Sequence, residues 1–186
     1  MKTDIIESFS EKETFETGFR LGKECKAGDI ILLDGDLGVG KTVFTKGFGK
    51  GLGIEETISS PTFTIMQIYE EGSLPLYHFD VYRIADIEEM DEIGYEDYFF
   101  GEGVCLIEWA TLITEIIPDK HLKVEIEKDI EKGFDYRKIK ITRNEEECEK
   151  SHSYADFSLG YWCGASQIAM MAEEKSPTRI SLRPVA

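Results

Sequence analysis

The segment that most constrains the fold of this chain is GDLGVGKT, which runs from Gly35 to Thr42. It fits the phosphate-binding loop pattern, in which a glycine and four further residues precede Gly-Lys-Thr. Glycines allow backbone conformations in which successive N–H groups point at a phosphate, and the lysine adds a charge that reaches the β- and γ-phosphates. The threonine hydroxyl is a hard oxygen ligand of the kind that Mg²⁺ accepts. The segment therefore predicts a site for nucleotide phosphates and their metal ion.

The residues on either side of the loop favour a strand before it and a helix after it. Residues 29–34 (DIILLD) form a short apolar run of strand type, and residues 43–51 can continue as a helix. Such a helix directs the partial positive charge of its N-terminus at the phosphates. The residues expected to bind the nucleotide here are Gly35, Asp36, Leu37, Gly38, Val39, Gly40, Lys41, Thr42 and Val43.

Helix and strand signals continue along the rest of the chain up to about residue 142. Ser10 and Glu13 form a capping box before a helix expected over residues 11–25. Strands expected over residues 63–69 and 74–80 are joined by so short a turn that they must pair antiparallel, which makes the sheet mixed. The other expected elements are a short acidic helix over residues 86–93, a buried strand over 104–107, a brief helical stretch over 112–117, and a hairpin at the edge or end of the sheet over 122–127 and 136–142.

Two of the expected strands end in a carboxylate that could serve the phosphate loop. Such a loop needs an acid at the end of a neighbouring strand, to hold Mg²⁺ directly or through water. Glu108 is the better candidate, because the four apolar residues before it describe a buried strand. Asp80 could polarise the attacking water or support the metal ion. For each residue the alternative is an ordinary acid at a strand end.

Thr62 lies in a Ser-Ser-Pro-Thr segment between the helix after the loop and the next strand. A threonine at this place can sense the γ-phosphate through Mg²⁺, although the same residues also form an ordinary turn. Arg83 either contacts the negatively charged phosphates or forms an ion pair with Asp86 or Glu88. His78 alternates with aromatic residues along a strand, which favours a structural role over ligand binding.

The base is expected to be adenine. No NKxD or TKxD motif of the kind that reads guanine occurs in the chain. Residues 91–94 (DEIG) match the DxxG switch of GTPases, but they follow a run of acids rather than a buried strand. We therefore expect ATP, together with Mg²⁺, as the ligand.

Composition limits the partners and the compartment. The net charge of −16 repels a phosphate backbone, so we do not expect the chain to bind nucleic acid unaided. Its four cysteines show neither CxxC spacing nor a His partner at metal-finger distance, which favours a reducing compartment. The first residues contain no apolar signal core, and no apolar stretch approaches the ~20 residues of a membrane span. We expect a cytoplasmic protein without membrane contact.

Six segments together carry a resemblance to a known family: SEKET, GDLGVGKT, SSPTFTI, YHFDVYR, GYEDYF and VCLIEW, in this order. From about residue 8 to residue 142 the chain resembles the TsaE (YjeE) family, the small bacterial P-loop ATPases of tRNA threonylcarbamoyladenosine modification. The resemblance implies an α/β fold of the P-loop NTPase type, in which a single domain has a mixed sheet flanked by helices. It also implies weak ATPase activity that rises in a complex with the TsaB and TsaD proteins.

Within that complex, the resemblance implies that ATP hydrolysis resets the partners between rounds, while TsaD performs the carbamoyl transfer to adenosine 37 of the tRNA. The tRNA would then be contacted only indirectly, which agrees with the acidic charge of this chain. Carried over by motif, Lys41 matches the phosphate-binding lysine, and Thr42 and Glu108 match the Mg²⁺ ligands. The other matches are Asp80, needed for hydrolysis; Glu11, near the nucleotide; and Trp109, beside the active site. The expected catalytic set is Lys41, Thr62, Asp80 and Glu108.

The last part of the chain departs from the family pattern. A run of charges over residues 145–150 is followed by residues 157–172, which contain no charged side chain. We therefore expect a P-loop ATPase domain over residues 1–144. Residues 145–186 are expected to form a C-terminal extension of unknown role, partly disordered.

Two other functions are compatible with the same loop. A stand-alone small-molecule kinase would need an acceptor pocket and usually an Arg-rich lid, whereas residues 82–103 hold a single Arg. A nucleotide-gated binding module, in which hydrolysis is incidental, is the third interpretation. Turnover that rises only with partner proteins would favour the ATPase component over both.

Overall fold

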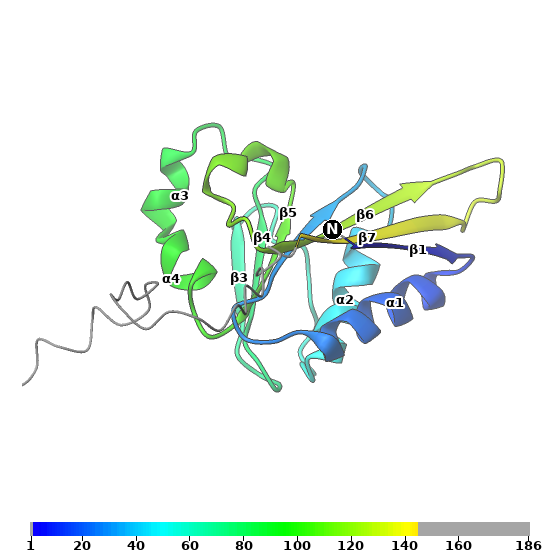
Figure 1. Cartoon of the computed structure of the whole chain (residues 1–186), viewed down its shortest axis with the longest axis horizontal. Coiled ribbons are helices and arrows are strands. Elements are labelled where there is room, and N and C mark those ends of the chain that lie inside the picture. Colours follow the sequence, from blue (N-terminus) through cyan, green and yellow to red (C-terminus); the bar gives the residue numbers. More distant parts are fainter. Residues whose placement is uncertain (1, 145–186) are drawn as a thin grey trace, which may run out of the picture. The chain divides into compact units, whose positions relative to one another are not determined.

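A seven-stranded mixed sheet forms the centre of the computed structural model, which describes residues 2–144 (Figure 1). The strands are β1 (Lys2–Ser8), β2 (Ile30–Asp34), β3 (Met66–Tyr69), β4 (Leu76–Asp80), β5 (Val104–Glu108), β6 (His121–Lys128) and β7 (Arg137–Asn144). Their order across the sheet is β1-β7-β6-β2-β5-β4-β3. The four central strands β6, β2, β5 and β4 are parallel, whereas β3, β7 and β1 pair antiparallel with their neighbours.

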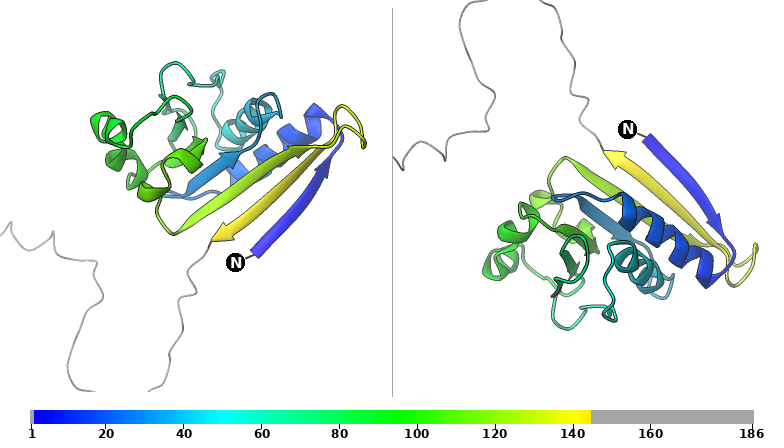
Figure 2. Two further views of the ribbon diagram at one scale, coloured as in Figure 1. Left: turned by 90° about the horizontal axis from the view of Figure 1, so that it is seen from above. Right: turned by 90° about the horizontal axis from the view of Figure 1, so that it is seen from below.

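Helices cover both faces of this sheet (Figure 2). The helices are α1 (Glu11–Glu24), α2 (Lys41–Gly51), α3 (Glu88–Ile93) and α4 (Tyr95–Phe99), with the 3-10 turns η1 (Ala110–Leu112) and η2 (Thr114–Ile116). Alternate residues of β2 supply the two apolar layers. Ile31 and Leu33 pack in one cluster with Phe44 and Phe48 of α2. Ile30 and Leu32 belong to the other cluster, together with residues of the helices that follow β4. The predicted α/β fold with a mixed sheet flanked by helices is confirmed.

Glycines bring α1 and α2 unusually close together. A Cβ added at Gly18 or Gly22 of α1 would lie 2.2 Å from Phe44 O or 2.1 Å from Phe48 O. On α2, a Cβ added at Gly47 would lie 2.0 Å from the carbonyl oxygen of Phe15. No side chain separates the two backbones at these points. The contacts advance along both helices together, so α1 and α2 run in the same direction and begin at the same end of the sheet.

The capping box before α1 is confirmed, with a small change of partner. The Ser10 hydroxyl accepts the backbone N–H of Glu13 at 3.2 Å. The Glu13 carboxylate accepts the N–H of Phe9 at 2.7 Å, one residue before the cap. The cap therefore fixes the direction in which the chain leaves β1 for α1.

The position of the predicted hairpin was wrong. β6 and β7 do form an antiparallel pair, but β6 also pairs with β2 in the middle of the sheet. The edge beyond β7 is β1, a strand that the sequence did not predict. Its two isoleucines, Ile5 and Ile6, are adjacent rather than alternating, so the segment lacks the period of two that marks a strand.

Several element boundaries also differ from prediction. α2 begins at Lys41 rather than at residue 43. β3 begins at Met66 rather than at residue 63, because Ile65 has a positive φ of 65° and ends a turn from Pro61. The brief helical stretch over 112–117 consists of the two 3-10 turns, and α4 was not predicted.

Residues 145–186, the predicted extension, lie outside the described part of the chain, and the boundary at residue 144 stays a prediction. Between residues 2 and 144, no helix has both the length and the apolar character that crossing a bilayer requires.

Candidate active site

The phosphate loop joins β2 to α2. Gly40 caps α2 with a left-handed backbone at φ 111°, and Gly38 has a φ of 72°. Residues with a side chain rarely adopt these angles, so the two glycines allow the loop to turn into the helix. The first turn of α2 contains no acidic residue. The helix N-terminus therefore directs unopposed positive partial charge at the loop.

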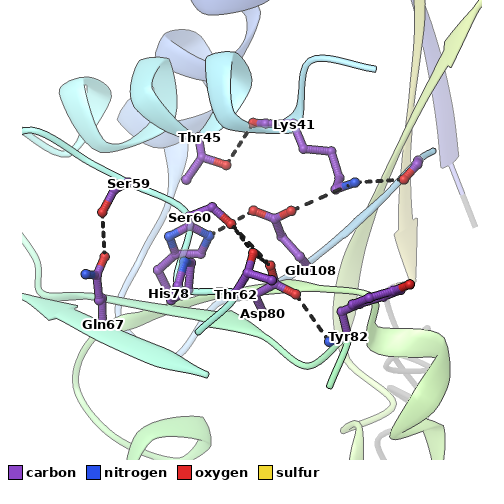
Figure 3. A network of polar contacts seen from close by, with 12 residues as sticks. Lys41, Thr45, Ser59, Ser60, Thr62, Gln67, His78, Asp80, Tyr82 and Glu108 are labelled. Carbon is purple, nitrogen blue, oxygen red and sulfur yellow. Dashed lines mark hydrogen bonds and ion pairs between the residues drawn. The ribbon is translucent and has the colours of Figure 1, made fainter. Parts of the chain in front are cut away.

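Lys41, the first residue of α2, turns back over the loop (Figure 3). Its Nζ donates hydrogen bonds to the carbonyl oxygens of Gly35 at 2.8 Å and Asp36 at 3.3 Å. The ammonium lies 4.0 Å from Glu108 Oε2 and 4.5 Å from the centre of the Trp109 ring. Only 7% of Lys41 is exposed, so its charge is held by these contacts rather than by water.

The two predicted carboxylates lie side by side. β4 and β5 are parallel, and their register pairs Asp80 directly with Glu108 at the carboxyl ends of both strands. Asp80 is 2% exposed and Glu108 is 3% exposed. Ligands of open α/β sheets bind outside these strand ends, which is also where the loop lies.

Asp80 holds the segment that contains the predicted switch threonine (Figure 3). Its Oδ2 accepts hydrogen bonds from Thr62 Oγ1 at 2.5 Å and from Ser60 Oγ at 3.1 Å. Its Oδ1 accepts the backbone N–H of Tyr82 at 3.2 Å. Three groups of the chain thus hold the two oxygens of this carboxylate.

Glu108 has a different set of neighbours. Its Oε1 lies 3.1 Å from Nε2 of His78, and both side chains are buried. The next residue, Trp109, has a left-handed backbone with φ 64°. This conformation brings the indole over Lys41 and 5.1 Å from the Tyr82 ring. Trp109 thus lies beside the lysine of the phosphate loop.

A cavity of about 350 Å³ lies beside the phosphate loop and the two strand ends. Its lining residues are Leu37, Gly38, Gly40, Lys41, Thr42, Val43, Ser60, Thr62, Asp80, Tyr82, Glu108 and Trp109. All four residues predicted to be catalytic are among them. Gly35, Asp36 and Val39 belong to the loop but do not line the cavity, and Val39 is buried in the core.

Glu11 lies on the other side of the loop. It lines a second cavity of about 270 Å³ together with Thr14, Phe134, Asp135 and Arg137. Gly38, Gly40 and Val43 line both cavities. The two cavities therefore adjoin along the loop.

Arg137 is a loop contact that the sequence did not reveal. Its Nε donates to the carbonyl oxygen of Val39, and its Nη1 donates to the carbonyl oxygens of Phe134 and Tyr136. The arginine stands 98 residues from Val39, at the start of β7, and no local pattern links them. The guanidinium of Arg83 lies over the Phe63 ring at 4.5 Å, and the salt bridges of the described residues do not pair it with Asp86 or Glu88. Its contact with phosphate stays a prediction.

The donor set fits Mg²⁺ bound together with phosphates. Within residues 2–144, no group of three or more His, Cys, Asp or Glu side chains could hold a metal ion by itself. Mg²⁺ is usually bound through one or two carboxylates, waters and substrate phosphates rather than by an all-protein cage. Thr42 and Glu108 line the same cavity as the phosphate loop, so they offer a donor set of that kind.

A family model matches most of this chain. Residues 8–139 match the family described as threonylcarbamoyl adenosine biosynthesis protein TsaE. The chain belongs to the TsaE family. The predicted resemblance is thereby confirmed, and the family places the chain in tRNA threonylcarbamoyladenosine biosynthesis.

Relatives and a solved structure agree with this assignment. The tRNA threonylcarbamoyladenosine biosynthesis protein TsaE of Bacillus subtilis is 48% identical over 137 residues, which are 72% of this chain and 84% of the relative. Its counterpart in Treponema pallidum is 40% identical, covering 64% of this chain and 87% of the relative. The crystal structure of Bacillus subtilis YdiB superposes with a TM-score of 0.67 at 41% identity, covering 77% of this chain and 87% of that chain.

A third relative bears on the C-terminal extension. TsaE of Rickettsia conorii is 35% identical over 173 residues, and the alignment covers 91% of this chain and 95% of the relative. That share is larger than residues 1–144 alone can supply, so the alignment includes part of the extension.

Proposed function

We propose that this protein binds and hydrolyses ATP as the ATPase component of a tRNA threonylcarbamoyladenosine-modifying complex. The observation that carries the proposal is the convergence of Lys41, Thr42, Asp80 and Glu108 on one cavity at the phosphate loop. These residues come from the loop and from two neighbouring strand ends, so the fold brings them together. A P-loop ATPase needs this combination of phosphate-binding, metal-binding and water-orienting groups.

Each residue has a distinct role in the proposed reaction. Lys41 exchanges its contacts with the loop carbonyls for the β- and γ-phosphates, and the N-terminus of α2 holds the same groups. Thr42 and Glu108 hold the Mg²⁺ that accompanies ATP. Bound MgATP supplies the phosphoanhydride bond that is cleaved. Asp80 orients the attacking water, and Thr62 senses the γ-phosphate through Mg²⁺.

The second cavity is our candidate for the base and ribose. It continues from the loop toward Glu11, and Phe134 at its border is exposed at 87%. An exposed aromatic ring offers a face on which a base can stack. Adenine is preferred in this proposal, since the chain carries no guanine-reading motif.

The partners proposed are TsaB and TsaD, with hydrolysis resetting their complex between rounds. The net charge of −16 supports indirect contact with tRNA, because a surface this acidic repels nucleic acid. A cytoplasmic location follows from the same role. The biosynthetic names of the family and of its relatives support the pathway.

The test is partner-dependent turnover. ATP hydrolysis would be measured for the full chain alone, with TsaB and TsaD, and with Lys41→Ala in place of the unaltered chain. We expect stimulation by the partners and, for Lys41→Ala, a loss on the order of 100-fold, as for removal of one key electrostatic group. Lys46→Ala, an exposed lysine of the same helix, is the matched control.

Three results would contradict the proposal. Unchanged hydrolysis in Lys41→Ala would remove the loop from the mechanism. Transfer of phosphate to a small acceptor would favour the kinase. Tight ATP binding without partner-stimulated turnover would favour the nucleotide-gated binding module.

A further inference from the structure

His78 is a polar side chain in an apolar layer. It lies in the middle of β4, in register with Leu106 of β5. Its neighbour two residues earlier, Leu76, belongs with Leu106 to the cluster that packs against α2. His78 itself is 1% exposed. Burying an imidazole at such a place costs free energy unless the polar atoms find partners.

One atom of the ring has a partner among residues 2–144, and the other has none. Nε2 lies 3.1 Å from Glu108 Oε1, whereas Nδ1 is buried without any hydrogen-bonding group of the described chain. An ionised carboxylate only accepts hydrogen bonds, so toward an ionised Glu108 the donor of this contact is Nε2. The imidazole thus lies in this layer with a single polar contact, and that contact is Glu108.

The two oxygens of Glu108 are held from opposite sides (Figure 3). His78 contacts Oε1 from within the sheet layer, and Lys41 Nζ lies 4.0 Å from Oε2. Glu108 lines the cavity at the phosphate loop, whereas His78 does not. His78 therefore contacts the carboxylate from within the sheet layer, and the other oxygen lies on the side of Lys41, which lines the cavity.

We propose that His78 is a positioning residue that orients Glu108 for the Mg²⁺ of MgATP. The inference rests on the proposed function. A merely structural pair is a weak explanation, because replacing a buried polar pair by apolar residues of similar volume is often neutral or stabilising. The imidazole is useful where the carboxylate must be kept, and a hydrogen bond to a metal-binding carboxylate fixes its orientation.

Three substitutions separate positioning from packing. His78→Gln keeps an N–H donor near the place of Nε2, whereas His78→Asn carries its donor near the place of Nδ1 and is too short to reach Glu108. His78→Leu removes the donor altogether. The Gln and Asn variants are both polar amides that differ by one methylene, so they form a matched pair.

The readout is Mg²⁺ dependence. ATP affinity would be measured by calorimetry in EDTA and across a Mg²⁺ titration, together with thermal melts and the Mg²⁺ concentration that gives half-maximal hydrolysis. We expect the Asn and Leu variants to raise the Mg²⁺ concentration for half-maximal hydrolysis about 10- to 100-fold, the range seen when other hydrogen-bond partners of metal ligands are removed. The Gln variant should stay close to the unaltered chain. In EDTA all variants should bind ATP within about twofold of it.

Two outcomes would overturn the inference. Asn and Gln variants with the same Mg²⁺ dependence would show that the donor position is irrelevant. Lower melting temperatures with unchanged Mg²⁺ dependence would assign His78 to packing alone. If the unaltered chain failed to bind ATP at all, the proposed function would fall, and the inference with it.

Discussion

Asp80 accepts hydrogen bonds from three groups of its own chain: Ser60, Thr62 and the backbone of Tyr82. Two of our proposals are coupled through these contacts. Thr62 donates its single hydroxyl proton to Asp80, so this hydrogen bond would have to break before the same proton could be donated to a γ-phosphate. The described structure therefore represents an arrangement in which the proposed sensor and the proposed water-orienting group restrain each other.

A pair of substitutions separates the roles of the two acids. Asp80→Asn should lower turnover on the order of 100-fold, the range of a lost general base, while MgATP affinity changes little. Glu108→Gln should instead raise the Mg²⁺ concentration needed for turnover, because a metal ligand loses its charge. Hydrolysis rates and Mg²⁺ titrations of both variants provide the measurement. A normal Mg²⁺ titration in Glu108→Gln would move the metal-binding role to Asp80.

The sequence revealed the site residues that follow local patterns. Lys41 and Thr42 are adjacent in one motif, and Asp80 and Glu108 each end an apolar strand. The contact between His78 and Glu108 could not be predicted, because it depends on the register of two strands 30 residues apart. The nearest signal was the polar residue in an otherwise apolar and aromatic strand.

Among the elements, α1 and α2 were predicted from capping and motif signals, but their contact was not. Gly47 and Gly51 of α2 bring the backbones of the two helices together, and no local pattern in the sequence predicts that contact. β1 was missed for a related reason. Its pairing partner β7 is more than 100 residues away, and a seven-residue edge strand carries little pattern of its own.

Gly47→Ala tests the helix contact. Alanine favours a helix over glycine by about 1 kcal/mol, so at an open position the change would stabilise the protein. Here the new Cβ would lie 2.0 Å from a backbone oxygen of Phe15, which overrules that gain. We expect a net loss of about 1–3 kcal/mol in the free energy of unfolding, measured with denaturant. Lys46→Ala on the exposed side of α2 is the control, and a stabilised Gly47→Ala would refute the close contact.

The docking of β1 should depend on pH. Hydrogen bonds from Lys132 and Tyr136 lower the pKa of Glu7 below its ordinary value of 4.5. Because the folded value is the lower one, the contribution of Glu7 is present at neutral pH and is lost as the pH falls through 4.5 and then through the folded value. Between about pH 6 and pH 3, the range in which carboxyl groups titrate, the free energy of unfolding of Glu7→Gln should therefore fall less steeply than that of the unaltered chain. Glu56→Gln, at an exposed position, should keep the slope of the unaltered chain.

At the scale of the whole molecule, the two ends of the described chain meet. β1 pairs with β7 from Lys2 opposite Arg143 to Ser8 opposite Arg137. The first and last strands of the described chain therefore lie side by side at one edge of the sheet. The general α/β fold could be predicted because the phosphate loop requires a strand, a turn and a helix in that order. The pairing of the first strand with the last could not, since it brings together segments that share no local signal.

Removing residues 151–186 tests the predicted boundary. Every proposed contact with phosphate, metal or base lies before residue 142, and the described sheet already contains its edge strand. We expect ATP affinity and basal hydrolysis within about twofold of the full chain, or about 0.4 kcal/mol. Calorimetry with ATP and an ATPase assay measure these two properties, and a thermal melt measures folding. Loss of folding or activity would assign the extension to the domain. Because the alignment with the Rickettsia conorii relative includes part of the extension, partner-stimulated turnover of the shortened chain would be measured separately.

The glycine contact between α1 and α2 also limits where motion can occur. Where two backbones touch without intervening side chains, a displacement drives main-chain atoms into each other, and no change of rotamer can relieve it. Glu11 and Lys41, the first residues of the two helices, therefore belong to one rigid body. A change from ATP to ADP would leave this half of the site in place. We expect any movement to fall on the opposite wall, around Thr62 and Asp80, which the helix contact does not restrain.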